Sequence, residues 1–183
     1  MMTDKEKNKI SKFLSLVLRH NPEKIGLSLD EEGWTNTDEL IDKMNNTGVY
    51  LTFEDLKEVV DTNDKKRFVF SDNFFKIRAN QGHSIDVDLK LEPVAPPAIL
   101  YHGTTEKNIT SILEKGILKQ DRNYVHLSAD IDTATKVGMR YGKPVVIEIL
   151  ALEMHKKGNV FYLSENNVWL TDFIDNEFIL SVK

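Results

Sequence analysis

The sequence predicts an α+β protein of two lobes, and three observations support this class. Residues 1–90 contain three segments with helical spacing of apolar residues, followed by two short runs rich in aromatic residues. Residues 91–97 then form a proline-rich stretch, which is typical of a stiff, extended connector. Residues 98–183 alternate short apolar runs with short helical segments. We therefore expect a first lobe over 1–90, a linker over 91–97 and a mixed, strand-rich second lobe over 98–183.

The composition is that of an ordinary globular protein. The 183 residues suffice for two lobes, each near the lower limit for a core of its own, and 40% are hydrophobic against 29% charged. The absence of cysteine excludes disulfides, thiolate nucleophiles and cysteine-ligated zinc. No apolar run reaches the roughly 18 residues of a membrane span, and the first residues lack the apolar core of a signal peptide. We expect a cytoplasmic protein with no membrane partner.

The net charge of −5 argues against a protein that holds nucleic acid by bulk electrostatics. A few arginines can still form a local positive pocket on an acidic body. We therefore expect any nucleic-acid partner to be bound at one local feature of its structure rather than along a long duplex.

The first lobe begins with a predicted amphipathic helix. Its apolar stripe ends just before Asn21-Pro22 and consists of Ile10, Phe13, Leu14, Val17 and Leu18. On a helical wheel Arg19 falls opposite this stripe and His20 on its flank, so we expect both to reach solvent or a ligand. The alternative is a pair of cations placed at a helix C-terminus by the helix dipole.

Two shorter helices and a hairpin follow. Capping residues over 35–39 precede one apolar segment, and the capping-box string 52–55 precedes another. Residues 67–70 and 74–78, joined by Ser71-Asp72-Asn73, are typical of a β-hairpin. Three helices and a hairpin predict a winged-helix lobe.

In the second lobe we expect strands and helices in alternation. Strands are predicted at 99–102, 125–128 and 145–150, helices at 106–115, ended by Gly116, and at 130–137, and a run of short strands over 160–182. No Gly-x-Gly-x-x-Gly string follows a strand, so a Rossmann dinucleotide site is unsupported.

Arginine and histidine are concentrated in motif-like strings. Only five of the 24 basic residues are arginine, namely Arg19, Arg67, Arg78, Arg122 and Arg140. A chain that uses lysine for solvated charge keeps arginine where a planar fork for phosphate or carboxylate is needed. Four of the five histidines lie in the strings 19–22, 81–84, 101–104 and 125–128, and the fifth lies in a charged turn. The pattern predicts a phosphate-handling active site assembled from distant segments.

Two of these strings lie on predicted strands. Gly103 lets a ligand lie against the backbone, while His102 and the Thr104 hydroxyl supply polar contacts. A structural turn is the alternative. His126 points to the face opposite Val125 and Leu127, where it either contacts a ligand or makes its hydrogen bonds within the protein. A zinc site built from His83, His102 and His126 lacks any short-spaced pair, so we expect no metal.

The string Arg78-Ala79-Asn80-Gln81-Gly82-His83-Ser84 carries the highest density of polar groups. It offers a guanidinium fork, two amides, an imidazole and a hydroxyl without one large apolar side chain. This suits a polar ligand, and the alternative is a polar loop at a strand end.

Together these strings resemble the RNA 2′-phosphotransferases, which are NAD-dependent enzymes. The resemblance covers nearly the whole chain in eight islands: 18–22, 33–34, 66–68, 78–84, 100–104, 122 with 125–128, 137–140, and 168–171. It implies an N-terminal winged-helix lobe that binds RNA and a C-terminal ADP-ribosyltransferase-like lobe of mixed strands and short helices that binds NAD.

The resemblance also implies the site residues. The catalytic set is Arg19, His20, Arg67 and Arg122. The residues that hold NAD are His102, Gly103, Thr104, His126 and Ser128, with Arg78, Asn80, Gln81, His83 and Ser84 between the two substrates. Two departures stand out: Tyr124 replaces an expected histidine, and Asn166-Asn167 replaces Asn-Gly. Asparagine tolerates the left-handed backbone, so the second departure is mild.

The implied reaction transfers an internal RNA 2′-phosphate, as at a tRNA splice junction, to NAD as co-substrate. The products are 2′-hydroxyl RNA, nicotinamide and ADP-ribose 1″,2″-cyclic phosphate, formed through an RNA 2′-phosphate that carries ADP-ribose. We expect a monomer that uses no metal.

Two alternatives remain. A mono-ADP-ribosyltransferase acting on a phosphorylated nucleic-acid or protein acceptor would share the NAD lobe, although the matching strand carries Val168 rather than an activating glutamate. A winged-helix regulator needs a basic recognition helix, and segment 52–60 holds three carboxylates against one lysine.

Overall fold

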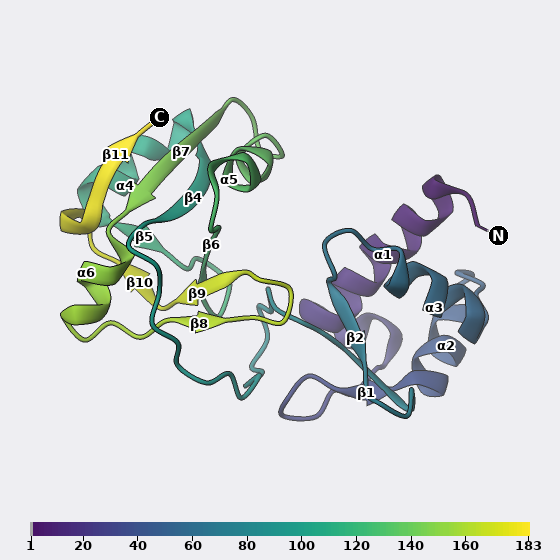
Figure 1. Ribbon diagram of the computed structural model, residues 1–183. Coiled ribbons are helices and arrows are strands. Elements are labelled where there is room, and N and C mark those ends of the chain that lie inside the picture. Colours follow the sequence, from purple (N-terminus) through teal and green to yellow (C-terminus); the bar gives the residue numbers. More distant parts are fainter. Residues whose placement is uncertain (1) are drawn as a thin grey trace. The chain divides into compact units, whose positions relative to one another are not determined.

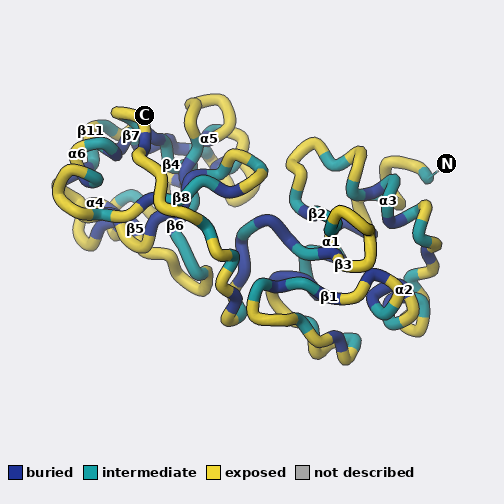
Figure 2. Tube along the Cα trace, turned by 60° about the horizontal axis from the view of Figure 1, so that its bottom comes forward, coloured by how far each residue is buried: buried dark blue, intermediate teal, exposed yellow. Residues whose placement is uncertain are grey.

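The computed structural model describes residues 2–183 and confirms a mixed α+β protein (Figure 1). The chain divides into two compact units whose boundary lies between Lys90 and Leu91. Each unit has its own buried hydrophobic cluster (Figure 2). No helix among the described residues is both long enough and apolar enough to cross a membrane.

The first unit contains the predicted helices and hairpin. Its helical elements are α1 (Asp4–Arg19), the 3-10 helix η1 (Pro22–Ile25), α2 (Thr37–Asn45) and α3 (Phe53–Asp61). Its strands are β1 (Thr35–Asn36), β2 (Phe68–Phe70) and β3 (Lys76–Ala79). The Thr52 capping box at the start of α3 is confirmed, because Thr52 and Asp55 bond to each other's backbone N–H groups.

The hairpin belongs to a sheet with the strand order β1-β3-β2. Sequence reasoning missed β1, because a strand of two residues has no measurable alternation, and Asn36 also caps α2 by accepting from Glu39 N–H. Phe68 pairs with Ala79, and the N–H of Asn80 donates to the carbonyl of Arg67 at 2.9 Å. The ladder therefore brings residues 67 and 80 side by side.

The second unit contains three small sheets, ordered β11-β7-β4, β6-β9-β8 and β10-β5. Its strands are β4 (Leu100–Thr105), β5 (Ile117–Leu118), β6 (Val125–Leu127), β7 (Pro144–Ile149), β8 (Tyr162–Leu163), β9 (Trp169–Thr171), β10 (Phe173–Ile174) and β11 (Ile179–Val182). Its helical elements are η2 (Glu106–Asn108), α4 (Ile109–Lys115), α5 (Ile131–Gly138), α6 (Ala151–Lys156) and η3 (Asn176–Phe178). Sequence reasoning placed His155 in a turn, but it lies in α6, a helix of six residues whose two buried apolar residues are too few to show a helical period.

Gly103 has a structural role that sequence reasoning did not reveal. It lies inside β4, and a Cβ added there would come within 1.8 Å of the carbonyl oxygen of Ala134 on α5. A Cβ added at Gly138, at the end of α5, would likewise come within 2.5 Å of the carbonyl oxygen of Thr104. The glycine at 103 is therefore required by the backbone-to-backbone approach of α5 to β4. Figure 1 shows this helix beside the strand.

Candidate functional site

Arg19 is the last residue of α1, and it is buried. Only 9% of it is exposed, so it does not reach solvent as one of the two expected alternatives had it, and its contact with a ligand stays a prediction. Its Nη2 donates to the carbonyl of Arg67 at 3.3 Å, and its guanidinium carbon lies 5.8 Å from the centre of the Phe68 ring. The helical wheel carries no information on residues 67–68 and on Gly82 after β3, which contact the Arg19 side chain.

Residues 79–84, here called the 79–84 loop, wrap around the end of α1. Gly82 has φ +89°, and a Cβ there would lie 3.4 Å from Nη1 of Arg19, so the bare backbone lies against the guanidinium. Ser84 donates its N–H to the carbonyl of Arg19 at 2.9 Å. Its hydroxyl is hydrogen-bonded to Nδ1 of His20, also at 2.9 Å. The loop thus holds both Arg19 and His20.

Asn80 connects the same loop to Arg67. Its side chain is buried, and its Nδ2 donates to the carbonyl of Lys66 at 2.7 Å. Since the carbonyl of Arg67 accepts both from the backbone of Asn80 and from Arg19, three distant segments meet here. The structure therefore brings Arg19, His20 and the backbone of Arg67 together within the first unit.

His83 reports the local positive potential. It is only 2% exposed, and burial lowers its pKa to about 4, with the charges of Arg19, His20 and Arg78 adding to the shift. The imidazole is therefore neutral at pH 7. Concentrated positive charge around a buried neutral ring is an environment that favours a bound anion.

Three buried polar atoms of the 79–84 loop make no hydrogen bond within the described part of the chain. They are Asn80 Oδ1, Gln81 Oε1 and His83 Nε2. Buried polar atoms of this kind are usually satisfied by water or a ligand. They fit the expectation of a polar ligand, and their contact with a cofactor stays a prediction.

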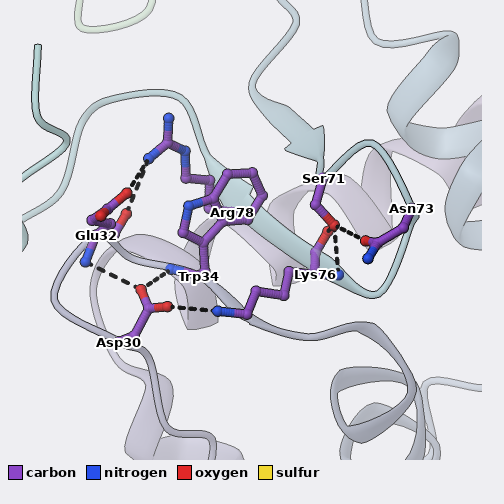
Figure 3. Close-up of polar contacts among 7 residues, drawn as sticks. All are labelled: Asp30, Glu32, Trp34, Ser71, Asn73, Lys76 and Arg78. Atoms are coloured by element: carbon purple, nitrogen blue, oxygen red, sulfur yellow. Dashed lines mark hydrogen bonds and ion pairs between the residues drawn. The ribbon is translucent and has the colours of Figure 1, made fainter.

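Arg78 is anchored in the first unit (Figure 3). Its guanidinium carbon lies 4.5 Å from the centre of the Trp34 ring, and its Nη1 donates to the carbonyl of Glu32 at 3.5 Å. Asp30 shapes the turn that presents Trp34 by accepting from the N–H groups of Glu32 and Trp34 and from Lys76. Whether Arg78 also contacts a substrate stays a prediction.

The predicted residues of the second unit gather around one cavity of about 620 Å³. Five of them line it: His102, Gly103, Thr104, Arg122 and His126. Ser128 is not among the lining residues, and its backbone instead pairs with Tyr101 on β4. The volume lies within the usual range for small-molecule sites.

A chain of hydrogen bonds orients the two histidines of this cavity. Arg122 Nη1 donates to Nδ1 of His126 at 3.3 Å, and the carbonyl of His126 accepts from Nδ1 of His102 at 3.1 Å. Burial lowers the pKa of His102, and the charge of Arg122 lowers it further against the opposing effect of the carbonyl bond. His102 is therefore neutral at pH 7, with its proton on Nδ1 and Nε2 left as an acceptor.

Sequence reasoning missed other lining residues, including Asn108, Lys119 and Tyr141. Asn108 donates to the Thr104 hydroxyl at 3.1 Å, a contact that the four-residue spacing alone did not signal. Tyr124, the departure from the expected histidine, lines the cavity and packs against Tyr162 with ring centres 5.5 Å apart. The left-handed backbone expected at Asn167 is confirmed by its φ of +59°.

Comparison with known proteins gives a consistent result. The model of the RNA 2′-phosphotransferase, Tpt1/KptA family, matches residues 5–173. A protein of Rhodopirellula baltica named "Probable RNA 2′-phosphotransferase" is 54% identical over 180 residues, which cover 98% of each chain. Proteins with the same name from Fusobacterium nucleatum, which is 53% identical over 93% of this chain and 96% of its own, and from Nostoc punctiforme, which is 49% identical over 99% of this chain and 100% of its own, are similar too. The chain therefore belongs to the RNA 2′-phosphotransferase family.

Proposed function

We propose that the protein transfers an internal 2′-phosphate of RNA to NAD, which acts as co-substrate. The observation that carries this proposal is that Arg19 and His20, neighbours at the end of α1, lie beside the backbone of Arg67, 48 residues further along the chain from Arg19. An RNA 2′-phosphate is a compact anion, and guanidinium forks and an imidazole are groups that recognise it. Together with Arg122 of the second unit, these residues form the proposed catalytic set.

The first chemical step requires little from the protein beyond positioning. A phosphate monoester is already anionic near neutral pH, so its oxygen can attack the anomeric carbon of the nicotinamide ribose without a general base. Nicotinamide leaves, and a bond forms between that carbon and the phosphate oxygen. Arg19, Arg67 and Arg122, here called the phosphate arginines, neutralise and orient the phosphate.

The cavity of the second unit fits the NAD that this chemistry needs. It combines a volume of about 620 Å³ with a neutral His102, the buried Thr104 and the cation of Arg122. A dinucleotide offers hydroxyls and amides to His102 and Thr104. We assign NAD contacts to these two residues and to His126, whereas Arg122, which lines the same cavity, belongs to the proposed catalytic set.

The second step moves protons, and His20 is the proposed acid or base. The neighbouring ribose hydroxyl attacks the phosphorus, and the RNA 2′-oxygen leaves as a hydroxyl with the cyclic phosphate as the other product. Nδ1 of His20 is hydrogen-bonded to Ser84, so proton exchange with the substrate falls to Nε2. Ser84 thereby fixes the ring for the transfer.

We further propose that the two units bind different substrates. The first unit, with three helices and the β1-β3-β2 sheet, serves as a winged-helix lobe for RNA. The second, with its small sheets and short helices, serves as an ADP-ribosyltransferase-like lobe for NAD. A cytoplasmic monomer that acts without metal completes the proposal.

The test is incubation with a short oligonucleotide that carries one internal 2′-phosphate, with and without NAD, followed by mass analysis. We expect NAD-dependent loss of the phosphate with release of nicotinamide and a cyclic ADP-ribose phosphate. Release of inorganic phosphate, or activity without NAD, would contradict the proposal. An oligonucleotide that retains ADP-ribose as its final product would favour mono-ADP-ribosylation of a phosphorylated acceptor.

A further inference from the structure

We propose that Asn63 and Asn80 form a clamp on the peptide group that joins Lys66 to Arg67, and that this clamp positions Arg67 for phosphate transfer. The inference rests on the proposed function, because it concerns one of the phosphate arginines. It assigns both asparagines as positioning residues that act through Arg67.

Asn80 holds the carbonyl end of the peptide. Its Nδ2 donates to the Lys66 oxygen at 2.7 Å, and its side chain is only 6% exposed. Its own backbone is fixed by the sheet, because its N–H donates to the carbonyl of Arg67 at 2.9 Å. The amide of Asn80 is therefore an anchored donor shielded from competing water.

Asn63 holds the other end. Its Oδ1 accepts from the N–H of Arg67 at 3.4 Å and from the N–H of Lys65 at 3.2 Å. Its Nδ2 donates to the hydroxyl of Ser11, a buried residue of α1, at 3.1 Å. The same peptide group is thus tied through Asn63 to α1 and through Asn80 to the sheet.

The backbone at this point needs such ties. Lys66 has φ +41°, in the left-handed region that a residue with a side chain adopts only when its surroundings impose it. Rotation of the following peptide toward an ordinary conformation would carry the Cα of Arg67 with it. A guanidinium displaced by about 1 Å can lower the rate on the order of 10²-fold.

The two asparagines make hydrogen bonds of opposite direction to this peptide group, so the same replacement should affect them differently. Asn63 acts on Arg67 as an acceptor, whereas Asn80 acts on Lys66 as a donor. Replacement by aspartate keeps the size, adds one negative charge at either position, keeps the acceptor and removes the donor. In Asn63→Asp, Ser11 can turn its hydroxyl hydrogen toward the new carboxylate, but in Asn80→Asp the carbonyl of Lys66 would face a carboxylate with no hydrogen to share.

The experiment compares Asn63→Asp with Asn80→Asp on the 2′-phosphorylated oligonucleotide at saturating NAD. We expect Asn63→Asp to keep wild-type kcat/KM for the RNA and Asn80→Asp to lose about 10-fold or more. The kcat/KM of Asn63→Ala, which removes the acceptor, should fall about as far as that of Asn80→Asp. The KM for NAD should stay unchanged in the two Asn63 variants, which separates misplacement of Arg67 from general damage to the fold.

Equal activity of the two aspartate variants, whether both high or both low, would overturn the clamp. If Asn80→Asp does not fold, Asn80→Ala takes its place, since it removes the donor without adding charge, and wild-type activity in that variant overturns the clamp as well. Hydrogen exchange at the Arg67 amide should be faster in Asn63→Ala than in wild type, and unchanged exchange refutes the tie. If the wild type is inactive on the 2′-phosphorylated oligonucleotide but its Arg67 amide is protected from hydrogen exchange, the proposed function is rejected and the hydrogen bond from Arg67 to Asn63 is not.

Discussion

Acidification should destabilise the first unit through His83. Burial lowers the pKa of His83 to about 4 from an ordinary value of 6.5, and Arg19, His20 and Arg78 add to the shift. Because the folded-state pKa is the lower one, the unfolded chain takes up a proton first as the pH falls below 6.5. The contribution of His83 to stability is complete above that pH and is lost as the pH falls toward 4. Between pH 7 and pH 5 the linkage relation gives a loss of roughly 2 kcal/mol.

Urea unfolding at pH 7 and pH 5 measures this loss. The chain has two tryptophans, Trp34 in the first unit and Trp169 in the second, so a Trp169→Phe background makes Trp34 fluorescence a reporter of the first unit alone. In this background the free energy of unfolding of the protein with His83 should fall between pH 7 and pH 5 by about 2 kcal/mol more than that of His83→Gln, whose side chain does not titrate.

Other titrating groups do not confuse the comparison. His102 also has a lowered pKa, but it lies in the second unit and is present in both proteins. The hydrogen bonds from Thr52 lower the pKa of Asp55 below its ordinary value, so its contribution is lost only at still lower pH. If both proteins show the same change between pH 7 and pH 5, His83 is not the buried neutral group described above.

Three further predictions concern the site. Arg→Lys at each of the phosphate arginines should lower kcat/KM more than about tenfold, or about 1.4 kcal/mol, because lysine lacks the planar fork; Arg140→Lys, in the exposed turn after α5, is the matched control and should stay active. Wild-type rates in all four variants would mean that diffuse charge suffices. His20→Ala should slow the second step more than the first and accumulate RNA that carries ADP-ribose, whereas a gel without that species would refute the assigned role. Gly103→Ala should destabilise the second unit by about 2 kcal/mol or more, seen as a lower melting temperature, because its Cβ would overlap the carbonyl of Ala134; an unchanged melting temperature would contradict this.

The sequence predicted the elements better than it predicted the surroundings of single side chains. Helices α1 and α3 were predictable because apolar spacing and capping residues are local signals. His102 and His126, which the resemblance assigned to NAD, line one cavity together with Arg122, which the resemblance assigned to the catalytic set. The burial of Arg19 and the part played by Asn63 were not predictable, because both depend on chain segments more than forty residues away that periodicity does not report.

The close approach of α5 to β4 has a consequence for how the cavity of the second unit receives a ligand. Strand β4 supplies His102 and Thr104 to the cavity, and the same helix and the turn after it supply Val137 and Tyr141. Because Gly103 and Gly138 leave no side chains to slide between these two elements, this wall is preorganised and costs little free energy to shape around a ligand. Adjustment to the bound molecule then falls to the irregular segment 119–124, which lines the same cavity between β5 and β6.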